Sequence, residues 1–118
     1  QVINITSIAG ITGNGSSIPY CASKAAMINM TQSLARTLAP KVRVNSIAPG
    51  FIDSQWTHAG LGDAYEGAAE RHRTGAALGQ IAQPEDVADA VLSLLEGSKL
   101  VTGQTLVVDA GALLGAKG

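Results

Sequence analysis

The chain has 118 residues, a formal net charge of −1 and a single cysteine. A balanced charge without a basic cluster argues against nucleic acid as a partner, no apolar run reaches the ~20 residues of a membrane span, and one cysteine cannot form an internal disulfide. We therefore expect one domain at most, large enough for a modest core, in the reducing setting of the cytoplasm.

The first element expected is a buried strand over residues 2–6, because VINIT is a short apolar run rich in β-branched residues. It ends at Ser7, and a glycine-rich loop over residues 7–18 follows. The glycines of this loop lack the spacing of the dinucleotide-binding fingerprint, and the last of them does not open directly into a helix. We interpret them as residues that permit tight turns beside a cleft.

A long helix is predicted from Pro19 to about Ala39. Proline suits the first helical position, Ser16 or Ser17 can cap the end before it, and Pro40 stops the helix. Helical spacing predicts that the large apolar side chains face the core: Met27, Ile28, Met30, Leu34 and Leu38. It leaves the following positions in water: Thr31, Gln32, Arg36 and Thr37.

Tyr20 and Lys24 lie four residues apart in this helix, so their side chains share one face. A free phenol has a pKa near ~10, and a neighbouring ammonium favours the phenolate. Such a tyrosine can give a proton to a carbonyl oxygen or take one from an alcohol. The spacing alone is common and is also explained by two neighbours on a helix, but the small residues around this pair would let a flat ligand approach.

Residues 42–48, VRVNSIA, predict a second strand that ends at Pro49 and Gly50. The preceding helix makes a right-handed crossover, so this strand should pair parallel to the first. Ser7 and the Pro49–Gly50 pair then lie at the carboxyl ends of neighbouring strands, where open α/β sheets bind ligands. We expect Asn45 to tie neighbouring backbone together rather than to act chemically.

Residues 51–82 are rich in alanine and glycine and predict short helices over about 62–74. His72 lies in the sequence ERHR, which is typical of a solvated helix face. Two isolated histidines without thiolate or carboxylate neighbours at ligand spacing predict no metal site.

A further helix is predicted to begin at Pro84, with acidic residues in its first turn, and to end at Gly97. Its expected buried stripe comprises Val87, Val91, Leu94 and Leu95. A last buried strand follows over residues 105–109, and residues 110–118 form a small, apolar tail. Charged residues make up only 14% of the chain, so we expect sister subunits or the rest of its own fold to cover much of its surface.

The expected order is strand, helix, strand, lid, helix, strand. This predicts an α/β fold with three parallel strands and helices, equivalent to the C-terminal half of a doubly wound, Rossmann-type sheet. Residues 1–118 would form a partial Rossmann-type catalytic region, with a lid over about residues 51–82. The first strand would keep one unpaired, apolar edge.

The chain also contains an ordered set of sequence motifs that resembles a known protein family. NITSIAG, YCASK, RVNSIAPG, PEDVA and TGQTLVVDAG together resemble the C-terminal half of a short-chain dehydrogenase/reductase of the compact branch. The resemblance extends over nearly the whole chain. The family's first half carries a glycine-rich diphosphate loop, the residue that selects between the two nicotinamide cofactors and an asparagine of the proton relay, and none of these is in this sequence.

The resemblance implies a role for each matching residue. Ser7 matches the serine that hydrogen-bonds the substrate oxygen, Tyr20 the catalytic acid/base, and Lys24 the lysine that tunes the tyrosine and holds the nicotinamide ribose. The residues matching the segment along the nicotinamide of NAD or NADP are Pro49, Gly50, Ile52 and Ser54.

In the family, the segment corresponding to residues 51–82 is a variable lid over the substrate. Trp56, His58 and Tyr65 are therefore candidates for substrate contact, with simple packing of the lid onto the core as the alternative. The implied partners are a small carbonyl or alcohol substrate and sister subunits in a homo-oligomer, a dimer or a tetramer.

The resemblance implies an NAD(P)-dependent oxidoreductase that transfers a hydride between nicotinamide and a carbonyl or alcohol. The motifs are similar to those of 3-oxoacyl-carrier-protein reductases and also to those of alcohol, sugar and steroid dehydrogenases. The alternative is a non-catalytic half-fold or interaction module, because the dinucleotide-binding half is absent from these residues and they would not hold the cofactor alone.

Overall fold

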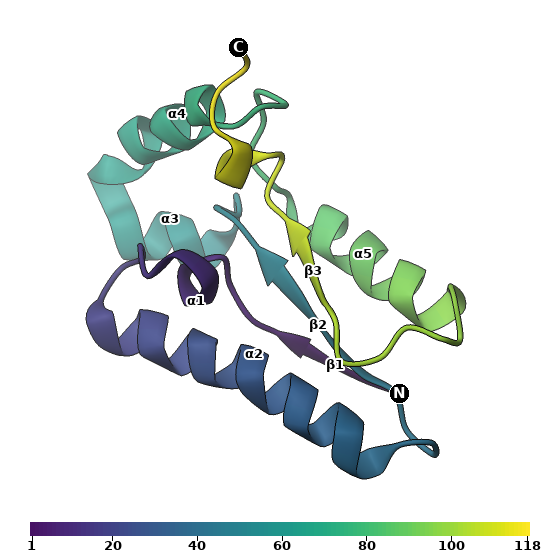
Figure 1. Cartoon of the computed structure of the whole chain (residues 1–118). Coiled ribbons are helices and arrows are strands. Elements are labelled where there is room, and N and C mark those ends of the chain that lie inside the picture. Colours follow the sequence, from purple (N-terminus) through teal and green to yellow (C-terminus); the bar gives the residue numbers. More distant parts are fainter.

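The computed structural model describes residues 1–118 as an α/β fold (Figure 1). The strands are β1 (Val2–Ile5), β2 (Val44–Pro49) and β3 (Thr105–Val108). The helices are α1 (Ala9–Thr12), α2 (Ile18–Leu38), α3 (Gln55–Leu61), α4 (Tyr65–Gly75) and α5 (Pro84–Glu96), with 3₁₀ turns at Gly62–Ala64 and Ala112–Leu114. The predicted order of elements and the fold class are confirmed.

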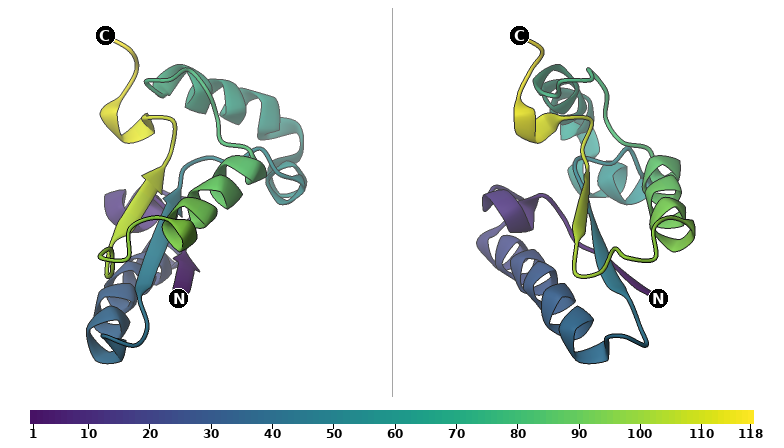
Figure 2. Two further views of the ribbon diagram at one scale, coloured as in Figure 1. Left: turned by 90° about the vertical axis from the view of Figure 1, so that its right-hand side faces the viewer. Right: turned by 45° about the vertical axis from the view of Figure 1, so that its right-hand side comes forward.

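The sheet has the order β1-β2-β3, and both pairings are parallel. Ile47 in the middle of β2 lies opposite Ile5 on one side and Leu106 on the other. Helices α2 and α5 contact β2 from opposite faces of the sheet (Figure 2). As a result every residue of β2 is buried, which explains its nearly continuous run of small and apolar residues.

Asn45 has no exposed surface and links β2 to the segment that leads into β3. Its Nδ2 donates to the Val101 carbonyl at 3.0 Å, and its Oδ1 accepts from the Gln104 amide at 3.0 Å. The predicted structural role of Asn45 is therefore confirmed, because both ends of its amide satisfy buried backbone groups.

Helix α2 begins one residue earlier than predicted, at Ile18. The Ser17 side chain caps it by accepting from the Tyr20 amide at 3.2 Å, which confirms one of the two predicted caps. The helix ends at Leu38, and the extended backbone of Ala39 leads into Pro40. Both ends lie within one residue of the prediction, because the prolines restrict where the helix can begin and where it must end.

The predicted burial within α2 is partly wrong. Thr31, predicted to be in water, has no exposed surface and accepts a hydrogen bond from Asn4 of β1 at 3.1 Å. Met30 and Leu38, predicted to face the core, are 46% and 38% exposed. The face of α2 that is buried carries small side chains, so the helix packs close to the sheet and the larger apolar residues lie to its sides.

The predicted loop over residues 7–18 contains the short helix α1. A Cβ on Gly10 would lie 2.6 Å from the backbone carbonyl carbon of Lys24, so glycine here lets α1 lie directly on α2. Gly13 has a φ of 71°, the left-handed conformation expected of a glycine in a tight turn. The glycines thus serve close helix contact as well as turns.

Strands β1 and β3 are less buried than their composition predicts. Val2 and Ile5 of β1 are 38% and 43% exposed, and Leu106 and Val107 of β3 are 39% and 37% exposed. Both are outer strands, so nothing in these 118 residues pairs with their free edges. No helix combines the length and apolarity needed to cross a lipid bilayer.

We predict that Asn45→Ala lowers the free energy of unfolding by about 2 kcal/mol, because it removes two hydrogen bonds of a side chain without exposed surface and leaves the Gln104 amide without its partner, while the Val101 carbonyl keeps its bond from Arg43. The midpoint of urea unfolding measures this loss. Gln104→Ala is the matched control, since the Gln104 side chain is exposed and the substitution leaves its backbone amide bonded to Asn45. Equal midpoints for the two variants would contradict the role assigned to Asn45.

Candidate active site

A hollow of about 540 Å³ opens at the carboxyl ends of β1 and β2. Its walls come from the residues after β1, the first turn of α2, the residues after β2, and helices α3 and α4. Its volume lies in the range of small-molecule sites, and its position is the edge at which parallel sheets bind ligands. The structure therefore has a cavity at the place where the sequence predicts the site.

Ser7 and Tyr20 line this hollow from different elements. Ser7 is buried, and its Oγ accepts a hydrogen bond from the Ala9 amide at 3.1 Å. That bond fixes the hydroxyl while leaving its proton free to be donated to a ligand. Tyr20 stands in the first turn of α2, where the Ser17 cap holds its backbone.

Lys24 lies one turn after Tyr20, and its Nζ is 5.7 Å from the centre of the Tyr20 ring. Its ammonium donates to the Ile5 carbonyl at the end of β1, at 3.3 Å. The structure thus places the cation beside the phenol, as the four-residue spacing predicts. Lys24 itself does not line the hollow.

Besides Tyr20 and Lys24, the residues predicted to bind cofactor fall into two groups. Gly50, Ile52 and Ser54 line the hollow. Pro49 is buried behind it, and its carbonyl accepts from the Ile8 amide at 3.1 Å, which joins the ends of β1 and β2. Ser54 caps α3 by accepting from the Thr57 amide at 3.2 Å.

This wall suits a flat ring that carries a polar substituent. Phe51 and Ile52 supply an apolar surface, and the hydroxyl groups of Ser7, Tyr20 and Ser54 stand around the same hollow. A nicotinamide has both features, an aromatic ring and a carboxamide, so the residues present fit this part of the cofactor.

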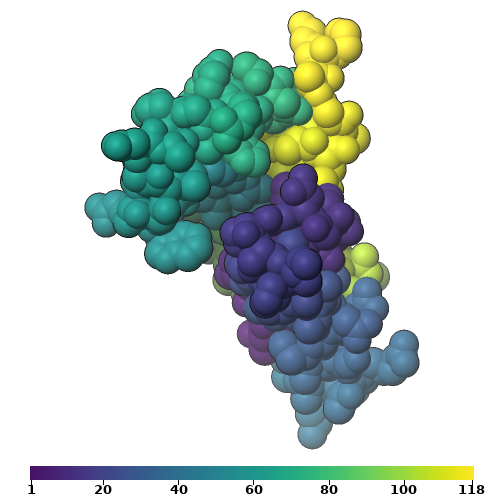
Figure 3. Space-filling model, turned by 90° about the vertical axis from the view of Figure 1, so that its left-hand side faces the viewer, coloured from purple at the N-terminus to yellow at the C-terminus, as the bar shows by residue number.

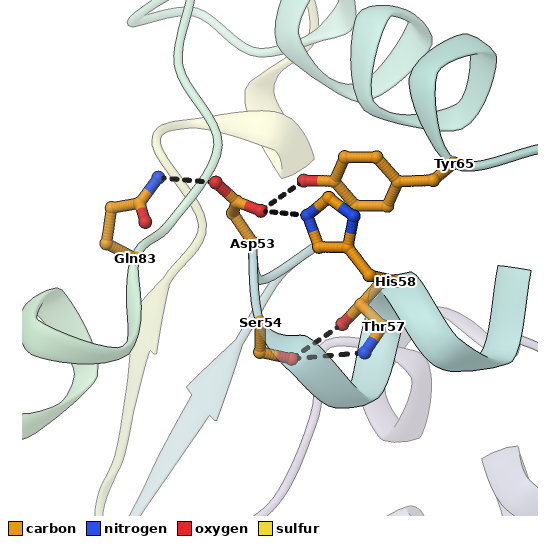
Figure 4. Close-up of polar contacts among 6 residues, drawn as sticks. All are labelled: Asp53, Ser54, Thr57, His58, Tyr65 and Gln83. Atoms are coloured by element: carbon orange, nitrogen blue, oxygen red, sulfur yellow. Dashed lines mark hydrogen bonds and ion pairs between the residues drawn. The ribbon is translucent and has the colours of Figure 1, made fainter. Parts of the chain in front are cut away.

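Of the three residues between 51 and 82 that were predicted to contact substrate, Trp56 alone lines the hollow. Its side chain is 81% exposed at the rim. His58 and Tyr65 point instead to the carboxylate of Asp53 (Figure 4). His58 Nε2 is 2.8 Å from Asp53 Oδ1, and the Tyr65 hydroxyl donates to the same oxygen.

Asp53 is the hub of this polar cluster. The rings of His58 and Tyr65 stack with their centres 3.5 Å apart, and Gln83 Nε2 donates to Asp53 Oδ2 at 3.2 Å. The end of β2 is thereby tied to α3, α4 and the start of α5. Sequence reasoning missed this role, because the partners lie up to 30 residues away and no local signal links them to Asp53.

The cluster shifts two ionisations in opposite directions. The hydrogen bond from Tyr65, followed by those from His58 and Gln83, holds the pKa of the Asp53 carboxyl below its ordinary value of 3.8. The same bond to a carboxylate raises the pKa of Tyr65 to about 12. Tyr65 is therefore an un-ionised donor at neutral pH, and its hydroxyl is already committed to Asp53.

His72 is exposed, as its sequence context predicts, but one face of its ring is covered. Its ring stacks on Phe51 with the centres 4.4 Å apart and an angle of 18° between the planes. Burial, and secondarily the charge of Arg71, lowers the pKa of His72 below 6.5. The ring also lines the hollow. The charged neighbours in the sequence hid this packing.

Residues 1–112 match the sequence profile of the protein family described as enoyl-(acyl carrier protein) reductase. The chain is 43% identical over 116 residues to the short-chain dehydrogenase/reductase homolog YusR of Bacillus subtilis, covering 96% of this chain and 83% of that relative. It is 45% identical over 116 residues to the 3-oxoacyl-[acyl-carrier-protein] reductase FabG of Rickettsia bellii, covering 97% of this chain. It spans only 46% of the length of that reductase.

The structure is also similar to solved structures. A small-chain dehydrogenase determined in complex with NADPH aligns with a TM-score of 0.86 and 28% identity. The alignment covers 96% of this chain and 51% of that protein. The similarity therefore extends over the three strands and their helices, the part of the fold that surrounds the hollow.

We predict that Tyr65 ionises near pH 12, and that Asp53→Asn lowers this value because it removes the carboxylate that holds the proton. Absorbance at alkaline pH after a rapid pH jump measures the ionisation. Since folding favours the protonated phenol, its stabilisation is present below pH ~10 and is lost as the pH rises towards 12. The chain has two tyrosines, so Tyr20→Phe is the control and should retain the absorbance change near pH 12. An absorbance change near pH 12 that survives in Tyr65→Phe would contradict the assignment.

Proposed function

Because the chain belongs to the short-chain dehydrogenase/reductase family, we propose that it acts in an NAD(P)-dependent oxidoreductase that interconverts a carbonyl compound and an alcohol. One observation supports this most directly: Ser7 and Tyr20 line a single hollow, and the Lys24 ammonium lies 5.7 Å from the Tyr20 ring. Proton transfer to a carbonyl oxygen needs a hydrogen-bond donor to that oxygen, an acid and a nearby cation. A serine, a tyrosine and a lysine can supply these three functions.

Tyr20 gives the proton. In the direction of reduction, the phenol hydrogen moves to the substrate oxygen as the carbonyl carbon gains a hydride, and the product is an alcohol. The Ser7 hydroxyl donates a hydrogen bond to the same oxygen and stabilises its developing negative charge. In the reverse direction the phenolate takes the proton from the alcohol.

Lys24 supports the charge on Tyr20. An ammonium beside a phenol favours the phenolate, so the Lys24 cation would stabilise the negative charge that Tyr20 carries once it has given up its proton. The hydrogen bond to the Ile5 carbonyl holds the ammonium at the end of β1. Lys24 is thereby positioned by the sheet rather than by its flexible chain alone.

Gly50, Ile52 and Ser54 would hold the nicotinamide end of NAD or NADP along one wall of the hollow. A bound nicotinamide supplies or accepts the hydride. The chain's own contribution is to orient the ring against the apolar surface of Phe51 and Ile52, and to offer hydroxyl groups to its carboxamide.

For the substrate we propose a 3-oxoacyl compound or a similar ketone. The relative of Rickettsia bellii carries the name of a 3-oxoacyl-[acyl-carrier-protein] reductase. Away from the apolar surface proposed for the nicotinamide ring, Ile8, Trp56 and Leu61 add apolar lining to the hollow, which suits the chain attached to such a carbonyl.

We also propose that the protein is a homo-oligomer, a dimer or a tetramer. Ile18, Leu100 and Leu114 are 87%, 94% and 85% exposed. Exposed apolar side chains of this size favour cover by another polypeptide surface. The low content of charged residues, 14%, points in the same direction.

A second candidate, a non-catalytic interaction module, has one observation in its favour. The outer edge of β1 is unpaired, with Val2 and Ile5 exposed, and an open edge of this kind pairs readily with another chain. Titration of the purified protein with NADH and NADPH, with its intact mass measured on the same sample, separates the two candidates. Tight binding of one cofactor and its oxidation by a 3-oxoacyl thioester support the oxidoreductase, whereas no binding of either supports the module.

We predict that Tyr20→Phe lowers kcat by at least about 10²-fold, because the variant keeps the ring but has no proton to give. Steady-state oxidation of the cofactor measures the rate, and fluorescence titration measures cofactor affinity. The affinity should remain nearly unchanged, which separates loss of chemistry from loss of binding. Near-normal turnover in this variant would exclude Tyr20 as the acid.

We predict that Lys24→Ala weakens cofactor binding, lowers the rate and moves the pH optimum for alcohol oxidation upward. The reason is that the phenolate of Tyr20 then forms without a neighbouring cation, so a more alkaline solution is needed. A pH–rate profile measures the shift. Lys41→Ala removes an exposed lysine after α2 and serves as the control, with an unchanged profile expected. If both variants keep the original profile, Lys24 does not tune Tyr20.

A further inference from the structure

A second hollow, of about 390 Å³, adjoins the first. It lies between α1, α4 and the C-terminal 3₁₀ turn, and both hollows are lined by Ile8, Asn14 and His72. In the space-filling view, the surface is hollowed between the purple segment that contains α1 and the teal lid (Figure 3). The two hollows therefore share part of their lining, and a ligand long enough to pass these residues would reach from the first into the second.

The stacked pair of Phe51 and His72 stands where the two hollows meet. His72 lines both of them, and Phe51 lines the first. A carbonyl held by Ser7 and Tyr20 and a group in the second hollow would lie on either side of this pair. A molecule that occupies both needs a spacer chain, and the aromatic surfaces favour an apolar one.

Arg71 of α4 gives the second hollow its charge. Its side chain makes no ion pair and no hydrogen bond, whereas Arg73, two residues on, is paired with Glu70 at 2.6 Å. The guanidinium lies along the helix, because a Cβ on Gly67 would be 3.4 Å from Arg71 Nη1. An unpaired guanidinium at a hollow is suited to a carboxylate or a phosphate, which it can bind through two parallel hydrogen bonds.

The other lining residues do not compensate this charge. No aspartate or glutamate lines the second hollow, and Thr12 and Asn14 add neutral polar groups to it. The Arg71 charge reaches the shared wall, where it contributes to lowering the pKa of His72. Arg71 is the permanent cation of this hollow, because a guanidinium stays charged at every physiological pH.

We propose that the second hollow binds the anionic end, a carboxylate or a phosphate, of a carbonyl substrate whose apolar spacer passes the Phe51–His72 pair, and that Arg71 is the residue that binds the anion. The inference rests on the proposed function, since it assumes that the carbonyl lies at Ser7 and Tyr20. It narrows the substrate class to carbonyl compounds that carry a negative charge at a distance from the reacting carbon.

Two matched pairs of probes test this proposal. 7-Oxooctanoate and its methyl ester differ in a carboxylate, and S-acetoacetyl phosphopantetheine and S-acetoacetyl pantetheine differ in a phosphate. Trp56, the single tryptophan, lines the first hollow, so its fluorescence reports binding of each probe without turnover. We expect the anionic member of at least one pair to bind about 10-fold more tightly than its neutral partner, the scale of a hydrogen bond to a charged group.

Arg71→Gln should abolish this preference and leave the neutral probes unchanged, and Arg71→Lys should restore part of it. Arg73→Gln is the matched control on the same helix and should retain the full preference. The pair of probes whose charged member binds more tightly shows whether the bound anion is a carboxylate or a phosphate. Equal affinities within both pairs, or equal losses for charged and neutral probes in Arg71→Gln, would overturn the proposal.

Reduction of the neutral methyl ester with NADH or NADPH is measured separately. Failure of this reduction counts against the proposed function, whereas loss of the charge preference counts against the role of Arg71. The two failures are thus read from different measurements.

Discussion

The complete burial of β2 is the constraint on which the rest of the structure depends. A strand without exposed surface needs a neighbour at each edge and a helix on each face, and β1, β3, α2 and α5 fill these four places. The site follows from this packing, because Ser7 continues β1, Gly50 continues β2, and Tyr20 enters from the helix that connects them. Asn45 supports the same strand from within by closing two buried hydrogen bonds.

Local chemistry made the framework predictable from the sequence. Proline and serine at the ends of α2 specify its limits, and the β-branched runs specify the strands. The four-residue spacing of Tyr20 and Lys24 places the phenol and the ammonium on one face, and the parallel crossover brings Ser7 to the same edge of the sheet. Each of these inferences needs only neighbours in the chain and the geometry of one crossover.

The errors arose where distant residues decide the outcome. Thr31 is buried against β1, where Asn4 bonds to it, and no periodicity reveals that contact. His72 is exposed as predicted, but the stacking of its ring on Phe51 was not foreseen. Strands β1 and β3 have the apolar composition of buried strands. They are nevertheless outer strands, and only β2 has a neighbour at both edges. The role of Asp53 was invisible for the same reason, since its partners come from three separate helical segments.

The convergence of those partners on one carboxylate has a mechanical consequence for the helices that follow β2. Asp53 continues directly from the core strand, so α3, α4 and the start of α5 share an anchor at their inner end. Helix α3, which carries Trp56 and Leu61 along the rim of the hollow, is thereby tied to the same carboxylate as α4. Loss of this single carboxylate would remove the attachment of both helices to the end of β2 at once.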